Sequence, residues 1–475
     1  MLKSSNVQPM MLITSCAFNL ELFVLQFLIL KSSRSIYYNE TVDSFISTDD
    51  LEWRSKNSSG GEEFFNLETK AFYTTTKWNF ASNMVFGLIS LLSSNIIGML
   101  CDRFDVKKII ISIQVAHILP IVLLILGFLL NKGQLALYVA FAFMAIFGIL
   151  GGVNTIALIC SAYITRVYDD FDNTVEFSKL GAASIFGQMI PNIAGGFIID
   201  RLPIYYVYIL VSSLMIISII YCLCVLESVK ERSNRKAKLS IDGIQFVKES
   251  LKLLPCKRHG IQRFTLLVCS LAVVLISIAV MGANALFYLY LRKSPTFFTN
   301  SEVGLFCGIT MLLNTISLIL ILPFLKRWLN ELALCCLSLF ARALKFFCIA
   351  FLKNKILMFS ILPLAILCNM EIPILKSYAS AQVQSREQGR LMGVFASLQS
   401  VGFTISQFCI LEVYLLTLGT FPGTPYIICA LLCLSILPLL LSIVLYERIR
   451  LNANFEINPK DNCKSDVTDS LLRTL

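Results

Sequence analysis

Twelve long apolar runs divide this chain of 475 residues, and they constrain its fold more than any other feature of the sequence. About 20 apolar residues in a helix cross the hydrocarbon core of a bilayer. A backbone in that core must satisfy its own hydrogen bonds, as a helix does. The sequence therefore predicts an all-α membrane protein with twelve transmembrane helices. The runs cover residues 7–30, 78–100, 109–130, 135–164, 175–199, 204–226, 264–290, 302–325, 331–352, 356–381, 391–416 and 425–446.

The composition supports a membrane protein and excludes several other classes. Charged residues make up 15% of the chain, against about 25% in a soluble domain, and 56% is hydrophobic. The net charge of +10 is concentrated in loops between runs, which indicates interior loops at a bilayer rather than a nucleic-acid surface. The sixteen Cys lie almost entirely in apolar runs without metal-ligand spacing. We therefore expect no enzyme, catalytic residue, metal site or cofactor.

The first loop, residues 31–75, sets the predicted topology. It is polar and carries two glycosylation sequons, which begin at Asn39 and Asn57 and place the loop outside the cytosol. The excess of Lys and Arg in alternate loops agrees with this orientation and puts both termini in the cytosol. A signal peptide is the alternative interpretation of the first run, but Asn19 and Glu21 interrupt it.

The central loop predicts a division into two six-helix bundles. Residues 1–226 form the expected first bundle, 227–263 a basic cytosolic linker, 264–446 the second bundle and 447–475 a cytosolic tail. Within the linker, residues 240–254 could form an amphipathic surface helix. A six-plus-six arrangement is typical of transporters built from two related bundles.

The hairpin between the second and third runs carries a motif. It reads Gly98-Met-Leu-Cys-Asp102-Arg103-Phe-Asp-Val-Lys107-Lys, and it resembles the loop between helices 2 and 3 of the major facilitator superfamily. Gly98 would allow close helix packing. Asp102 could cap a neighbouring helix or pair with a basic residue across the bundle, while Arg103 and Lys107 would meet the anionic leaflet.

This resemblance implies the major facilitator fold and a gate at the cytosolic face. We assign the gate to Gly98, Asp102, Arg103, Lys107 and Arg390. The alternative is an ordinary basic turn between two helices. The hairpin after the eighth run keeps a basic pair but lacks the Gly and Asp, which predicts a gate element confined to the first half.

Ionisable and polar groups within the runs are candidates for the substrate path, because such groups are costly in a membrane. In this superfamily the first, fourth, seventh and tenth helices line the path. The candidates are Glu21, Asn154, Asn284, Glu371 and Lys376. Internal ion pairing, helix packing for the Asn residues and snorkelling for Lys376 remain alternatives.

Helix bends are predicted in two runs. Pro191, Gly195 and Gly196 form a bending element in the fifth run. In the tenth run, Pro373 is expected to break the helix between Glu371 and Lys376 and to free backbone carbonyls for a substrate.

Three segments of the second half resemble solute carrier family 46, the family of the proton-coupled folate transporter and the thymic stromal cotransporters. They are residues 371–380, 387–400 and 419–423. The resemblance implies proton-assisted import of organic anions. Arg166, Glu176 and Gly181 depart from the positions where the folate transporter has its coupling residues, so folate is not the expected substrate and proton coupling stays open.

The sequence as a whole predicts a monomeric multi-pass transporter that moves a small organic anion by alternating access. Its expected partners are that anion, the lipid bilayer and, as an open point, protons. The plasma membrane is the expected location, with the lysosomal membrane as an alternative. A transporter-like receptor or scaffold that binds a ligand without moving it is the competing hypothesis.

Overall fold

The computed structural model describes residues 7–38, 61–129, 133–167, 173–201, 204–228, 260–292, 300–352, 354–384, 387–417 and 420–457. The described part of the first half contains helices α1 (Gln8–Tyr38), α3 (Gly61–Arg103), α4 (Val106–Ala116), α5 (Ile118–Leu129), α6 (Gly133–Ile149), α7 (Gly152–Val167), α8 (Asn173–Arg201) and α9 (Ile204–Val225). These helices follow the first six apolar runs, with the third run divided into α4 and α5 and the fourth into α6 and α7.

The second half is built in the same way from the remaining six runs. Its described helices are α11 (Gly260–Arg292), α12 (Asn300–Ile316), a π-helical turn (Ser317–Ile321), α13 (Leu322–Leu325), α14 (Glu331–Phe351), α15 (Lys355–Phe359), a 3-10 helix (Leu362–Leu367), α16 (Glu371–Ala381), α17 (Gln388–Thr417) and α18 (Thr424–Ile457).

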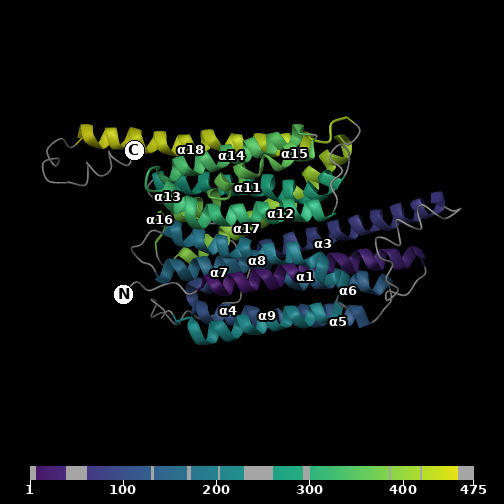
Figure 1. Cartoon of the computed structure of the whole chain (residues 1–475). Helices are drawn as coiled ribbons and strands as arrows, with labels where there is room; N and C mark the ends of the chain where they lie inside the picture. Colours follow the sequence, from purple (N-terminus) through teal and green to yellow (C-terminus); the bar gives the residue numbers. More distant parts are fainter. Residues whose placement is uncertain are drawn as a thin grey trace.

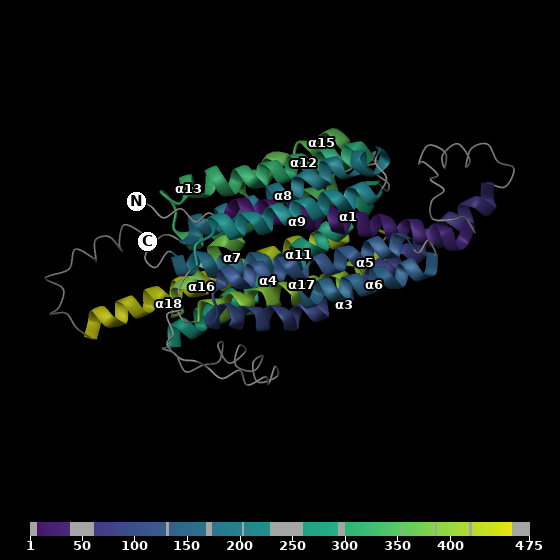
Figure 2. The same cartoon turned by 90° about the horizontal axis from the view of Figure 1, so that it is seen from below.

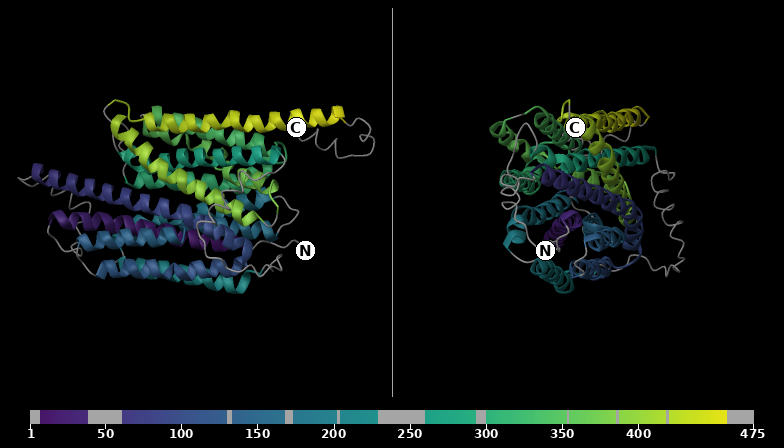
Figure 3. Two further views of the ribbon diagram at one scale, coloured as in Figure 1. Left: turned by 180° about the vertical axis from the view of Figure 1, so that it is seen from behind. Right: turned by 90° about the vertical axis from the view of Figure 1, so that its right-hand side faces the viewer.

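The helices form two bundles that lie side by side with their axes roughly parallel. In Figure 1 the first half, purple to teal, lies below the second half, green to yellow. The end-on view in Figure 3 shows the same two groups, whereas in the view from below in Figure 2 the two halves overlap. The fold is therefore the predicted one, with two six-helix bundles.

Eleven segments within the described residues are long and apolar enough to cross a membrane. Helix α8 is not among them, because it carries Glu176, Lys179, Gln188 and Asn192 among its apolar residues. It packs against α1 of its own half and against α12 of the other half. A helix covered by protein on two sides can be more polar than one surrounded by lipid, so α8 completes the twelve.

Lipid-facing surfaces are visible as stripes of exposed apolar residues. On α9, Ile209, Ile216, Ile220 and Leu223 are each more than half exposed. Their spacing of three, four and seven residues puts them on one face of the helix. A bilayer is the environment that would cover such a face.

Three helices continue beyond the ends of the apolar runs. Helix α1 extends to Tyr38 and α3 begins at Gly61, so both enter the segment predicted as an exterior loop. The 43 residues of α3 span about 65 Å, twice the thickness of a hydrocarbon core, and the helix projects beyond its neighbours (Figure 1). At the other end, α18 continues to Ile457 instead of ending near residue 446.

The fourth run, residues 135–164, was predicted as one transmembrane helix but is interrupted near its middle. Gly151 and Gly152 have φ of +77° and +59°, which separates α6 from α7. Only glycine takes this conformation without strain.

Several predictions fall outside the described residues. The sequons at Asn39 and Asn57, the predicted linker helix 240–254 and most of the tail are among them.

Candidate functional site

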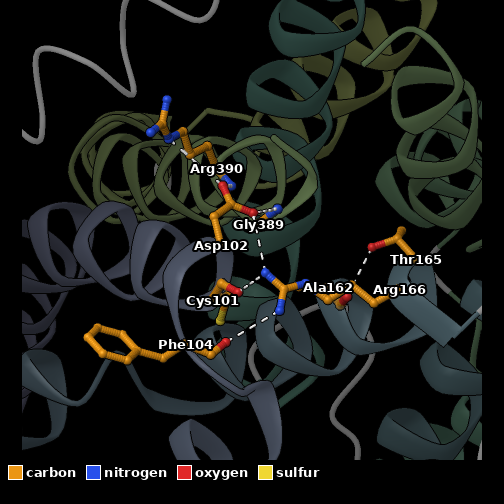
Figure 4. Close-up of polar contacts among 8 residues, drawn as sticks. All are labelled: Cys101, Asp102, Phe104, Ala162, Thr165, Arg166, Gly389 and Arg390. Carbon is orange, nitrogen blue, oxygen red and sulfur yellow. Dashed lines mark hydrogen bonds and ion pairs between the residues drawn. The ribbon is translucent and has the colours of Figure 1, made fainter. Parts of the chain in front are cut away.

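Asp102 connects the two halves at the end of the molecule where α3 meets α4, which we call the hairpin end. Its carboxylate accepts hydrogen bonds from the backbone N–H groups of Gly389, at 2.7 Å, and Arg390, at 2.8 Å. These residues lie in the first turn of α17, where N–H groups lack partners within the helix. The negative charge also complements the helix dipole. Asp102 thus caps a helix of the other half (Figure 4).

Two guanidinium groups flank the same carboxylate. Arg390 Nε lies 3.8 Å from one oxygen, and Arg166 at the end of α7 lies 3.9 Å from the other. Arg166 also donates to the backbone oxygens of Cys101 and Phe104 in the last turn of α3. The sequence had marked Arg166 only as a departure from a family pattern. The structure places it in the Asp102 cluster, where it holds the end of α3 (Figure 4).

Gly98 lies where α3 and α17 approach most closely. A Cβ atom at Gly98 would be 2.7 Å from the backbone oxygen of Gly389 and 2.7 Å from the Cα atom of Gly393. The predicted close packing at Gly98 is therefore present, and its partner is α17. Any larger residue would force the two halves apart at the hairpin end.

The basic residues of the hairpin differ in their roles. Lys107 does not point to a lipid surface, because its ammonium group donates to the backbone oxygens of Leu223 and Leu226 at the end of α9. A cation there satisfies carbonyl groups that the helix leaves unpaired. Lys107 therefore holds the hairpin to its own half, and it forms no hydrogen bond to the described residues of the other half. Arg103 is partly exposed at the end of α3.

A second polar contact joins the halves at the hairpin end. Thr174, in the first turn of α8, donates to the carboxylate of Glu331 at the start of α14. The Thr174 hydroxyl also lies 2.7 Å from the Oγ atom of Ser377 in α16. Lys326 pairs with Glu331 at 2.7 Å. The polar contacts between the halves thus include the second hairpin, where Glu331 provides the acidic group that the motif lacks.

The tenth run is interrupted before α16 rather than at Pro373. The 3-10 helix ends at Leu367, Asn369 has a φ of +70°, and α16 then runs without a break from Glu371 to Ala381. Pro373 lies in the first turn of α16, where its missing N–H costs no helical hydrogen bond. The predicted position of the break was wrong by a few residues.

Glu371 is buried in an ion pair within the second half. Its carboxylate lies 2.5 Å from the guanidinium of Arg342 in α14, and Ser338 donates to it at 2.6 Å. Arg342 also donates to the side-chain oxygen of Asn369 in the break. Glu371 is 1% exposed and directed at α14, so in this conformation the structure favours the ion-pair alternative over direct contact with a substrate.

Lys376 faces the other half of the molecule. It lies five residues beyond Glu371, about 140° around the helix, and the neighbouring Ser377 contacts Thr174 across the bundle boundary. The Lys376 ammonium is within electrostatic range of Cys160 in α7. It forms no ion pair or hydrogen bond with any residue that the structure describes, and the side chain is partly exposed.

The other path candidates lie in different surroundings. Glu21 is completely buried in the first half, and neither carboxylate oxygen accepts a hydrogen bond from the described residues. Asn154 is partly exposed on α7, and Asn284 is exposed on α11. The bending element Pro191, Gly195 and Gly196 lies inside α8, which continues through it. No hydrogen bond or ion pair joins any of these described residues to Lys376.

The fold and these contacts define a class of protein: a transporter with two bundles that contact each other through polar groups at one end. The model of the Major Facilitator Superfamily matches residues 68–407. The chain belongs to this superfamily, whose members are transporters rather than enzymes.

More specific similarities confirm the resemblance to solute carrier family 46. The chain is 22% identical over 438 residues to the lysosomal proton-coupled steroid conjugate and bile acid symporter SLC46A3 of Gallus gallus, covering 90% of this chain and 91% of the relative. It is 20% identical to the class C tetracycline resistance protein of Escherichia coli, over 75% of this chain and 85% of that protein.

Solved structures share the fold. The human organic anion transporter MFSD10 (TETRAN) superposes with a TM-score of 0.68 at 15% identity, covering 91% of this chain and 97% of that chain. The transporter FucP in the outward conformation gives 0.58 at 12% identity, covering 93% and 99%.

Proposed function

We propose that this protein moves a small organic anion across its membrane by alternating access. The observation that carries the proposal is Lys376, a cation at the boundary between the halves without a protein counter-ion among the described residues. An ionisable group is costly at membrane depth unless it is paired. An anionic substrate would provide the missing partner.

The relatives support the same substrate class. The Gallus gallus relative is named for steroid conjugates and bile acids, and one structural neighbour is titled an organic anion transporter. Lys376 presents a compact charge without the bidentate geometry of an arginine, which suits different anionic groups equally.

In the proposed cycle, this conformation is the one in which the hairpin end is closed. The Asp102 contact and the Thr174–Glu331 contact both join the halves at that end. Transport requires both contacts to break so that the substrate can leave there. We propose that the hairpin end is cytosolic and that both termini lie on that side, as the sequons at Asn39 and Asn57 and the positive loops indicate.

We assign proton coupling to Glu21. A buried carboxylate without a hydrogen-bond donor is stable only when it is neutral, and the described residues offer Glu21 no donor. The Tyr208 phenol is within electrostatic range of the Glu21 carboxylate. Replacing Glu21 with Gln should leave anion binding intact while removing the effect of an imposed pH gradient on uptake.

The deciding experiment uses purified protein in sealed vesicles and a panel of organic anions at pH 5.5 and pH 7.4. We expect saturable uptake that K376A abolishes and K355A preserves. Lys355 is the matched control, because its ammonium group already has a counter-ion, the half-exposed Glu302 carboxylate at 2.8 Å. Saturable binding of an anion without flux would instead support the receptor hypothesis.

The lysosomal membrane is the location that the similarity to SLC46A3 favours, and the plasma membrane remains the alternative. Co-localisation of tagged protein with a lysosomal or a surface marker separates them. A single chain contains both halves of the path, so we propose a monomer, which the mass of the detergent-solubilised protein would test.

A further inference from the structure

Helix α14 carries a polar stripe that faces the interrupted tenth segment. Ser338, Arg342 and Lys345 are spaced by four and three residues, which places them on one face of a helix. The first two members both contact Glu371 at the start of α16. Lys345 continues the stripe toward the break in the chain and is within electrostatic range of Cys368 there.

The charges along this stripe do not balance among the residues that the structure describes. Glu371 neutralises Arg342. Lys345, like Lys376, forms no ion pair or hydrogen bond with any described residue. Buried nitrogen atoms without a hydrogen-bond partner do occur in this structure, but the two lysine ammonium groups are not among them. Each ammonium group therefore keeps some accessible surface. Within the described part of the second half, Lys345 and Lys376 are therefore two partly accessible cations without counter-ions.

The two lysines lie at different depths. Helices α14 and α16 are antiparallel, because Glu331 and Ser377 both lie at the hairpin end. Lys345 lies three residues beyond Arg342 and is therefore about 4.5 Å farther from the hairpin end than Arg342. Lys376 lies five residues beyond Glu371 and is therefore about 7.5 Å closer to the hairpin end than Glu371. Since Arg342 and Glu371 are in contact, the two lysine positions are separated by about 12 Å along the helix axes.

We propose that the transported substrate is an elongated dianion whose two anionic groups are bound separately by Lys345 and Lys376. The proposal rests on the anion transport proposed above and specifies its substrate class. The break at residues 368–370 lies beside Lys345, which is within electrostatic range of Cys368. Lys376 acts at the boundary between the halves and Lys345 acts deeper in the second half.

The test compares three sulfated steroids that keep fixed charges over the whole pH range. Estradiol 3-sulfate is a monoanion. Estradiol 3,17-disulfate carries its sulfates at opposite ends of the rigid ring system. The 2,3-disulfate of 2-hydroxyestradiol carries two adjacent sulfates, and it controls for charge without separation. Uptake and competition are measured in sealed vesicles that contain the full chain.

We expect the 3,17-disulfate to compete at least tenfold more strongly than either other compound in the wild type. K345Q should reduce that preference to about one while monosulfate uptake continues, and K345R should restore it. K376Q should reduce uptake of all three. K355Q serves as the control for the loss of a lysine, since Lys355 is exposed and paired with Glu302.

Equal competition by the three compounds in the wild type overturns the proposal, and this comparison needs no variant to fold. An equal loss of mono- and disulfate uptake in K345Q also overturns it, provided that the variant reaches the membrane with wild-type thermal stability. If the wild type takes up no anion at all, both the proposed function and the proposal of a dianionic substrate are wrong.

Discussion

The carboxylate of Asp102, in the last turn of α3, lies 2.7 Å from the backbone N–H of Gly389, in the first turn of α17. The two residues are 287 positions apart in the chain and belong to different halves. A hydrogen bond from a helix N-terminus to a carboxylate is strong because both charge and dipole favour it. In the transport cycle proposed above, this contact breaks each time the hairpin end opens.

Replacing Asp102 with Asn should weaken the closed state. The change keeps the shape, but it removes the charge and replaces one of the two acceptor oxygens by an NH2 group, so one of the two hydrogen bonds is lost as well. The loss is worth about 2 kcal/mol, or roughly a thirtyfold change in equilibrium. Fewer molecules would then be competent to take substrate from the opposite side, so the apparent KM for uptake should rise. The apparent KM is obtained from initial uptake rates measured over a range of substrate concentrations.

Asp105→Asn is the matched control for that change. Asp105 lies on the same hairpin but caps α4 of its own half, accepting from the Lys107 N–H at 3.1 Å. Asn caps a helix as well as Asp does. An equal rise of the apparent KM in both variants would show that the charge of the hairpin matters and the contact between halves does not.

Gly98→Ala should separate α3 from α17. The added methyl would meet backbone atoms at 2.7 Å, which side-chain rotation cannot relieve, at a cost of about 1–3 kcal/mol. We expect uptake to fall at least tenfold. Gly304→Ala is the control, because nothing lies within 4 Å of its added Cβ, and Ala stabilises a helix relative to Gly. A loss of uptake in the control alone would contradict the packing argument.

The Thr174–Ser377 contact offers a direct test of the second polar contact. Their hydroxyl oxygens are 2.7 Å apart, so cysteines at both positions should form a disulfide under mild oxidation. The bond would lock the hairpin end closed. Uptake should stop on oxidation and return on reduction, whereas T174C and S377C alone should be insensitive. Full activity of the cross-linked protein would show that these helices do not separate during transport.

We expect the Arg342–Glu371 pair to stabilise the folded protein rather than to contact the substrate. Removing one partner of a buried pair leaves an unpaired charge and costs about 3–5 kcal/mol. We expect R342Q and E371Q each to lower the thermal stability strongly, and the double variant to lower it by less than their sum. Substitutions in the exposed Glu302–Lys355 pair should cost about 1 kcal/mol or less. Additive effects in the buried pair would refute coupling.

The sequence determined the fold class and one of the two contacts at the hairpin end. Run length and apolarity specify a membrane helix directly, because the bilayer selects them segment by segment. The Gly and Asp of the first hairpin were sufficient to predict a close helix contact and a cap. Even Lys376 could be selected from sequence alone, since a lysine inside an apolar run is costly wherever it points.

Tertiary structure decided which groups are partners. Glu371 could have met Lys376, but helix geometry turns it to Arg342 and leaves the lysine facing the other half. Arg166 became part of the Asp102 cluster, and Glu331 supplied the acid that the second hairpin lacks by motif. These pairings join residues tens to hundreds of positions apart. They depend on how helices cross, and the apolar pattern that drives each helix into the membrane contains no information about the crossing.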